Sequence, residues 1–540
     1  MQNFSDKNLH SMKLQPTYSR RGERRSPNFD VKTVSVSMSR VVRNPLILDA
    51  IFANLDLPDL KTCRVVCGEW ADVGVTLLGK GALLNVNKLF PYKSSKVPPV
   101  NDKLMRRLLI SGKFDGLISY SKKNNFITRG LTELPKVSEL TREIQFVPAQ
   151  KEFVPVFLQG IRALGSTKVG RIDIVSAWDS GMDDYIIFAK SYKKLPPQVN
   201  LTSLRFKIVS DYGFDGADAT SEFKPLIKIW TDAAPNLTTL DVAASLYPDL
   251  EGCESLKVLK FECITSDLGS RELNFGSLTS MLGQVKDSLI ELELNVWDSM
   301  QQIQPVKGGP VMSKLTTLSI HAKNAHQPLE IIDFFDEDHL PKLKTFRVHN
   351  ICHDSSFLPY LNLWRRHRGV KSLALTMDSI GFGADYWRKT VDLFPSVKEF
   401  NLNMTPEDIA SLPDLSWITE PLQTWELERV NVSVVGVKNS FVMTDVLQAM
   451  SVLRGAKSIR FWNTGVLESE FSPDIQNLIL HSRGFKSVEI SGRVESEIVE
   501  RIRPIFEASG APINFTGGVI HKLSRNVSNM GFARDPSLRK

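Results

Sequence analysis

The hydrophobic residues follow one short pattern that recurs through most of the chain. An apolar residue is followed three positions later by a second and two positions after that by a third, as at Leu289, Leu292 and Leu294. Successive starts from residue 289 to residue 422 are 26, 28, 27, 27 and 25 residues apart, a regularity that indicates a repeat protein. Copies start at Leu201, Leu237, Leu256, Leu289, Leu315, Leu343, Val370, Val397, Leu422 and Phe485, with a degenerate copy at Ile459/Phe461 and an earlier candidate at Ile172/Ile174.

A helical pattern precedes many copies and ends at a glycine or a proline. Apolar residues between Phe223 and Trp230 recur at helical spacing before Pro235, and those between Val446 and Leu453 do so before Gly455. Glycine favours a helix C-terminus and proline prevents its continuation. The same sequence of signals occurs at 329–341, 358–369, 391–395 and 475–484. Each unit is therefore predicted to be a helix, a turn and a short strand.

Units of this kind cannot bury their apolar sides alone, so stacking them builds one continuous core with the strands along the inner curve. The step resembles the period of leucine-rich repeats, although the asparagine ladder usual in that family is missing. We predict an α/β repeat fold, a leucine-rich-repeat solenoid over residues 141–515. The alternative is a Rossmann-like α/β sheet, which the many short, evenly spaced strands and the lack of a G-x-G-x-x-G motif disfavour.

Residues 44–75 carry a different, purely helical pattern. Asn44-Pro45 is a good helix start, because asparagine caps free N–H groups and proline fits the first turn. Leu48, Ile51, Phe52 and Leu55 then share one helical face, and Leu46 falls nearly opposite that face. After a break at 56–59, a second stretch from 60 to 70 again has helical spacing. So small a unit buries little surface, and some of its apolar side chains should face a partner or the rest of the chain.

This stretch resembles the F-box family. The family pattern is a proline-led helix ending in Ile-Phe-x-x-Leu, then Asp-Leu, then Val-Cys-x-x-Trp, and here the opening departs from the usual Leu-Pro. The matching residues are Pro45, Ile51, Phe52, Leu55, Asp59, Leu60, Val66, Cys67 and Trp70.

The resemblance implies a small all-α module, residues 44–83, that binds the Skp adaptor of Skp–cullin–F-box ubiquitin ligases and through it a cullin. The adaptor-binding residues implied are Pro45, Leu46, Ile47, Leu48, Ile51, Phe52, Leu55, Leu60, Val66 and Trp70. The alternative is a plain helical hairpin packed on its own chain.

Charge separates the ends of the chain from its body. Of the net charge of +7, residues 1–40 hold +5, with eight basic and three acidic side chains. We predict a disordered basic tail over 1–43, a linker and partly helical connector over 84–140 with a short helix at Lys103–Ile110, and a C-terminal tail over 516–540. The body is nearly neutral, which argues against nucleic-acid binding.

Motifs of catalysis, cofactor binding and metal binding are missing. No Walker, H-E-x-x-H or G-x-S-x-G pattern occurs, and Cys63 and Cys67 have no further zinc ligands nearby. Cys352-His353 is interpreted as a chance pair in a loop, because adjacent residues on a strand would face opposite ways. We therefore predict no catalytic residue, cofactor or metal. Five scattered cysteines without a secretory signal indicate a cytoplasmic and/or nuclear protein, and no apolar run is long enough to cross a membrane.

Function is then predicted to lie on the inner strand surface, at residues between the apolar positions. Their mixed signs favour a protein target, and Trp462 is a candidate anchor whose alternative role is to pack beneath the final helix. The predicted surface comprises Arg205, Lys207, Glu291, Glu293, His321, Arg347, His349, Glu426, Glu428, Arg460 and Trp462. We predict a substrate-recognition adaptor of a Skp–cullin–F-box ligase. One alternative is an interaction scaffold outside any ligase with a vestigial F-box, and a more distant one is an α/β enzyme.

Overall fold

The computed structural model describes two compact units, one up to Gly81 and one from Ala82 onward. The boundary lies two residues before the predicted end of the helical module. The described residues are 43–86, 101–111, 140–148, 153–164, 168–178, 192–210, 223–244, 246–263, 275–297, 308–323, 336–351, 365–377, 384–405, 415–437, 440–462, 475–492 and 496–517. The predicted tails, 1–43 and 516–540, lie outside them except for residues 43, 516 and 517. The helical patterns at 329–335 and 358–364 and the pair Cys352-His353 also lie outside them.

The first unit contains the helices α2 (Pro45–Phe52), α3 (Leu57–Cys63) and α4 (Gly68–Gly81), and we call it the helical module. Asn44 caps α2 as predicted, because its side chain accepts a hydrogen bond from the Leu46 N–H at 3.0 Å. Asp56 caps α3 by accepting from the Asp59 N–H at 2.9 Å. The predicted second helical stretch is therefore two helices, since α3 ends before the 64–67 turn and α4 starts anew at Gly68.

The core of the helical module is small and aromatic. Leu48, Phe52 and Leu60 are buried, and the Phe52 ring meets the Trp70 ring edge-on with centroids 5.1 Å apart. Gly74 of α4 lets the helices approach, because a Cβ there would lie 3.1 Å from Arg64 Cγ. The buried face of α2 is narrower than the sequence pattern predicted, because Ile51, a predicted member of that face, is 49% exposed.

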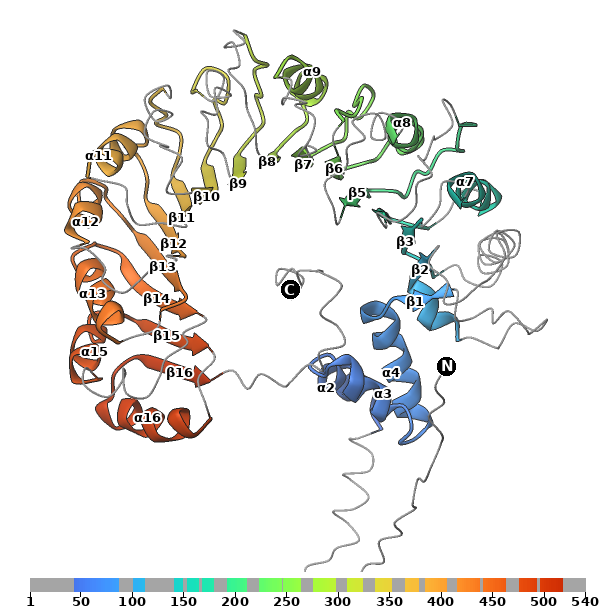
Figure 1. The fold of residues 1–540 in the computed structure, drawn as a ribbon. Coiled ribbons are helices and arrows are strands. Elements are labelled where there is room, and N and C mark those ends of the chain that lie inside the picture. Colours follow the sequence, from blue (N-terminus) through green and yellow to red (C-terminus); the bar gives the residue numbers. More distant parts are fainter. Residues whose placement is uncertain are drawn as a thin grey trace, which may run out of the picture. The chain divides into compact units, whose positions relative to one another are not determined.

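The second unit is built on one parallel sheet in which each strand lies next to the strand that follows it in the chain. That order excludes a doubly wound, Rossmann-like sheet, in which the strand order reverses. In Figure 1 the strands of this unit lie on the inside of the curve and its helices lie on the outside. The strands are β1 (Leu84–Asn85), β2 (Arg107–Ser111), β3 (Glu143–Val147), β4 (Arg171–Trp178), β5 (Ser203–Ser210), β6 (Thr239–Ala244), β7 (Val258–Cys263), β8 (Glu291–Trp297), β9 (Thr317–Lys323), β10 (Thr345–Ile351), β11 (Ser372–Met377), β12 (Glu399–Met404), β13 (Arg429–Val435), β14 (Ala456–Trp462), β15 (Ser487–Gly492) and β16 (Ile513–Gly517).

Most described helices of this unit are followed by a turn and a strand, as predicted, but residues 246–257 between β6 and β7 contain no helix, so the prediction is wrong for that unit. Gly455 ends the segment after α13 in a left-handed conformation, with φ of 84°. A Cβ on Gly455 would lie 2.7 Å from the Leu427 carbonyl oxygen, so only glycine fits there. The helices are η1 (Asp102–Arg106, a 3-10 helix), α7 (Phe153–Leu164), α8 (Lys224–Ala233), α9 (Phe275–Val285), α11 (Ala384–Leu393), α12 (Ser416–Leu422), α13 (Ser440–Ser451), α15 (Ile475–Ser482) and α16 (Ser496–Ser509).

One continuous core lies between sheet and helices, because alternate strand residues point toward the helices. In β7, for example, Leu259, Phe261 and Cys263 are buried and the residues between them are not. Trp230 of α8 is fully buried, with its ring centroid 6.0 Å from that of Phe157 in α7. The described part of this unit is thus a repeat-like α/β fold, compatible with a repeat solenoid.

Threonine hydroxyls link neighbouring units at several repeat junctions. Thr202, Thr238 and Thr316 each stand just before a strand. Their hydroxyls donate to backbone carbonyls of the preceding unit, those of Gly170, Thr202 and Ile290, at 3.0–3.3 Å. These bonds tie neighbouring units together at the start of the strands.

The sheet begins earlier than predicted. Residues 84–140, predicted as a connector, contain β1, η1 and β2, which belong to the same sheet as the repeats. The short helix predicted at Lys103–Ile110 is wrong in its second half, because the buried Leu108 and Ile110 alternate with half-buried residues in strand β2. The polar N-terminal half of the predicted helix forms η1. Its helical pattern led to the prediction of one longer helix where β2 follows.

One predicted strand is out of register. The pattern at Leu422, Trp425 and Leu427 was interpreted as a repeat, but residue 422 ends α12 and β13 starts at Arg429. The repeat is Leu427, Val430 and Val432, which are all buried. Two overlapping copies of the same pattern exist here, and packing against β12, where Phe400 pairs with Val430, selects the later one.

No helix among the described residues is both long and apolar enough to cross a membrane.

Candidate target-binding surface

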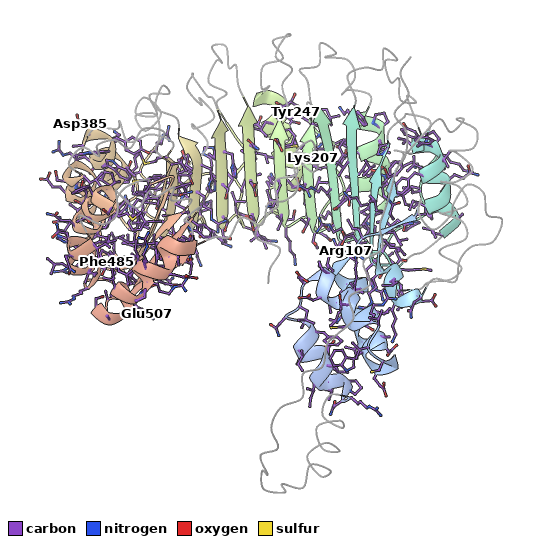
Figure 2. The ribbon with its side chains drawn as sticks, turned by 60° about the horizontal axis from the view of Figure 1, so that its bottom comes forward. Arg107, Lys207, Tyr247, Asp385, Phe485 and Glu507 are labelled. Carbon is purple, nitrogen blue, oxygen red and sulfur yellow. The ribbon has the colours of Figure 1, made fainter. Side chains whose placement is uncertain are left out.

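The side chains that point away from the helices form what we call the inner face of the sheet. Parallel register places them in rows across the strands. One row joins Asp173, Arg205, Asp241, Lys260 and Glu293 from β4 to β8, so acidic and basic residues alternate. Figure 2 shows Lys207 over the strands, whereas Asp385 and Glu507 lie on helices.

Cross-strand ion pairs neutralise this part of the inner face. Arg205 Nε lies 3.0 Å from Asp241 Oδ2, and Lys260 Nζ lies 2.7 Å from Glu293 Oε2. Lys207 reaches Glu262 two strands away at 3.8 Å. Such partly exposed pairs add little stability individually, but they fix the pattern of charge that a partner meets.

Glu293 of β8 is the centre of this network. Its carboxylate also lies 3.3 Å from His321 Nε2 of β9. The hydrogen bond to His321, followed by that from Lys260, lowers the pKa of Glu293 to about 2. Asp241 differs, because desolvation raises its pKa although the Arg205 charge opposes the shift. Glu293 therefore keeps its negative charge while bound to two partners.

Two histidines stack beside this network. The rings of His321 in β9 and His349 in β10 are nearly parallel, with centroids 4.2 Å apart, and His349 Nδ1 lies 3.2 Å from the Thr376 hydroxyl. Desolvation, and then the charge of His321, lowers the pKa of His349 to about 4. His349 is therefore neutral near neutral pH and packs as a flat polar ring.

Arg347 stands alone on the same strand. Its side chain is exposed, and no carboxylate of the described residues lies within ion-pair distance of it. In register it faces Ser319 of β9 and Ala374 of β11, both small residues. The alternation of charge seen from β4 to β8 therefore stops at this point.

The inner face of β11 to β13 is mostly uncharged. Asn431 donates through Nδ2 to Asn401 Oδ1 at 2.8 Å, while Arg429 pairs with Glu399 at the start of the same strands. The sequence interpretation missed these two asparagines because it sought a ladder after the strand. Period-two alternation within the strand was the signal that could have found them.

Trp462 lies at the exposed end of β14. Its side chain is 42% exposed, which is inconsistent with the alternative that it packs beneath the final helix. The Arg460 guanidinium lies 5.4 Å from its ring centroid and 2.6 Å, through Nε, from Glu489 Oε2. Arg460 thus braces the ring and is itself neutralised.

Most of the predicted surface residues lie on the inner face, spread over strands from β5 to β14. Arg205, Glu291, Glu293, Arg347, Arg460 and Trp462 lie on strands at the inner face. Glu426 and Glu428 do not, because both precede β13 in the loop after α12. Glu428 instead pairs with Lys398, also outside a strand, at 2.6 Å. This correction follows directly from the shifted register of β13.

In the helical module, the predicted adaptor-binding residues divide by exposure. Leu48, Phe52 and Leu60 are buried, so in this conformation they support the module and are not accessible to a partner. Ile47, Leu55 and Trp70 are half-buried. The exposed members are Pro45, Leu46, Ile51 and Val66.

Two large apolar side chains exposed on the described part of the helical module were missed, Val65 and Leu57, of which Leu57 is 39% exposed. Val65 is 84% exposed, more than any other large apolar side chain among the described residues, and Leu46 follows at 81%. Val65 lies in the turn between α3 and α4, where helical spacing gives no signal.

No group of three or more histidine, cysteine, aspartate or glutamate side chains suited to a metal ion occurs within the described ranges. Cys63 ends α3 and Cys67 lies in the turn before α4, so they do not stand one turn apart on a single helix. Burial raises the pKa of both Cys253 and Cys263 to about 11, and these thiols pack as small apolar groups.

Comparison of the chain with protein-family models and with curated proteins found no match. The likeness to known families therefore rests on the residue pattern and the repeat-like fold.

Proposed function

We propose that this protein is a substrate-recognition adaptor of a Skp–cullin–F-box ubiquitin ligase. The helical module binds the Skp adaptor, and the sheet, a leucine-rich-repeat solenoid, holds a protein target on its inner face. The protein itself makes and breaks no bonds. It raises the concentration of its target near the ubiquitin-charged enzyme.

The observation that carries the proposal is the exposed apolar surface of the helical module. Leu46, Val65 and Val66 are 81%, 84% and 58% exposed, while the Phe52 ring packs edge-on against the Trp70 ring. Several exposed apolar side chains on so small a unit favour a protein interface. Val66 stands at a position of the F-box pattern, and Leu46 is among the adaptor-binding residues that the resemblance implies.

The inner face supports the second half of the proposal. It presents ion pairs, amides and one exposed tryptophan on rigid strands, a mixed polar surface suited to selective protein recognition. The neutral balance of these charges disfavours nucleic acid, which binds concentrated basic surface.

The test is binding of the full chain to purified Skp adaptor by titration calorimetry. Leu46→Glu/Val66→Glu places two charges on the proposed interface. We expect binding to weaken roughly hundredfold or more, because two apolar side chains no longer bury surface against the adaptor. The matched control is Phe441→Glu/Leu480→Glu, which changes two apolar residues exposed on α13 and α15. This control should bind as the wild type does.

Circular dichroism melts of all three proteins establish that each is folded. If the folded wild type does not bind the adaptor, the ligase proposal is wrong, and the protein is an interaction scaffold working outside a ligase. Equal weakening by both double variants would place the interface elsewhere.

A further inference from the structure

The cations on the inner face are almost all paired with an acid. Each of several arginines and lysines at register positions has a carboxylate of the described residues beside it. These pairs are Arg107–Glu143, Arg171–Asp173, Arg205–Asp241, Lys207–Glu262, Lys260–Glu293, Arg429–Glu399 and Arg460–Glu489. The sheet therefore satisfies its own cations, and a partner gains little by approaching them.

Arg347 in the middle of the sheet departs from this rule. Beside several other cations of the inner face, the paired position on a neighbouring strand holds an acid. Beside Arg347, the paired positions hold Ser319 on β9 and Ala374 on β11. Neighbouring strands lie about 4.8 Å apart, so an acid on either strand would reach the guanidinium. Ser319 is buried at 3% exposure, and both side chains are too short to cover the arginine. The guanidinium is left facing solvent on a rigid strand.

The neighbours of Arg347 offer it no negative charge. His349, two residues on along the same face, is stacked on His321 and is neutral near neutral pH. The carboxylate on the far side of His321, that of Glu293, is already held by Lys260 at 2.7 Å and by His321 at 3.3 Å. A negative group for Arg347 must therefore come from outside the described part of the chain.

We propose that Arg347 anchors an acidic side chain, a carboxylate or a phosphate monoester, on the protein target. This inference rests on the proposed function and names the chemistry that the inner face selects. A guanidinium binds either oxyanion through two parallel hydrogen bonds. An unpaired cation among described cations that are neutralised fits one acidic residue in an otherwise uncharged segment, and does not fit a polyanion.

The experiment uses the full chain and an array of synthetic nine-residue peptides. Each random sequence is made in three versions, with glutamate, phosphoserine or serine at the centre. We expect the wild type to retain acidic versions about tenfold more than serine versions, as a charge-assisted hydrogen bond predicts. The ratio of phosphoserine to glutamate then identifies the preferred oxyanion.

Arg347→Gln should reduce the acidic preference to about one. The matched control is Arg388→Gln, an arginine on helix α11, outside the inner face, whose guanidinium pairs with Asp385 at 3.2 Å, and its preference should equal that of the wild type. Thermal melts of both variants verify folding. An acidic preference that survives Arg347→Gln, or a wild type without one, overturns the proposal.

Adaptor binding measured on the same samples separates this inference from the proposed function. A loss confined to peptide preference leaves the adaptor interface standing. An acidic preference without adaptor binding keeps Arg347 as the anchor of a scaffold outside the ligase.

Discussion

The helical module and the sheet expose opposite kinds of surface. On the module, Leu46 and Val65 present bare apolar side chains to solvent. On the inner face of the sheet, Lys260 and Glu293 present charges that already have partners. Covering apolar surface is favourable with any partner of the right shape, whereas displacing a satisfied ion pair is favourable only with a matching one. Under the proposed function, the module would supply tight attachment and the sheet discrimination between targets.

The largest expected effect tests whether the two units are stable independently. Phe52→Ala removes the ring that packs on Trp70 and should cost about 3–5 kcal/mol of stability. That cost is comparable to the whole stability of a unit this small, so the module should unfold while the sheet remains folded. Hydrogen exchange resolved by mass spectrometry measures both units in one sample.

Trp230→Ala is the matched change in the second unit, since Trp230 of helix α8 is as deeply buried as Phe52. It should increase exchange in the flanking strands and leave α2 to α4 protected. If Phe52→Ala instead raised exchange throughout the chain, the two units would form one cooperative structure.

A smaller effect is expected within the charge network. Glu293→Gln removes the carboxylate that binds Lys260 and His321, and should lower the free energy of unfolding by about 1 kcal/mol. Glu428→Gln is the control, because its pair with Lys398 lies on exposed side chains and should contribute less than about 0.5 kcal/mol. Urea denaturation of both variants measures the difference. Equal costs would mean that the network adds nothing beyond isolated pairs.

Acid should weaken the sheet through His349. Its pKa in the folded state is about 4, below the ordinary 6.5. Between these values the unfolded chain binds a proton that the folded chain does not, so stability is lost as pH falls from 6.5 through 4. After allowance for partial exposure, His349→Asn should remove roughly 0.5 kcal/mol of that loss.

Melting temperatures at pH 7 and pH 5 measure this effect, and the variant should show the smaller decrease. Glu293 contributes separately, since its pKa of about 2 places its loss of stability below pH 4.5. An unchanged decrease in His349→Asn would mean that the histidine pair does not sense pH.

The smallest effect on stability is expected at the proposed adaptor surface. Leu46→Glu/Val66→Glu should change the free energy of unfolding by less than about 0.5 kcal/mol, because both side chains already face solvent. Thermal melts of the isolated protein provide the measurement. A loss above about 1 kcal/mol would show that these residues stabilise the chain itself, and the contrast between module and sheet would fail.

The sequence predicted the repeat well, because burial leaves a strong period in each strand. Leu289, Leu292 and Leu294 are all buried as that period requires. It failed where two copies overlapped, at Leu422 and Leu427, and where a polar start hid strand β2. It also placed the inner-face residues of correctly predicted strands, such as Arg205 and Arg347, and misplaced Glu426 and Glu428 with their strand.

The sequence by itself therefore determined the repeat, the alternation of most strands and the N-cap of α2, since these depend on residues close in the chain. Only the tertiary structure decided which charges are neutralised. Arg205 meets Asp241, and Arg347 meets Ser319 and Ala374, through register between strands some 27 to 36 residues apart. Local pattern cannot encode that pairing, because cross-strand neighbours are set by how successive units stack.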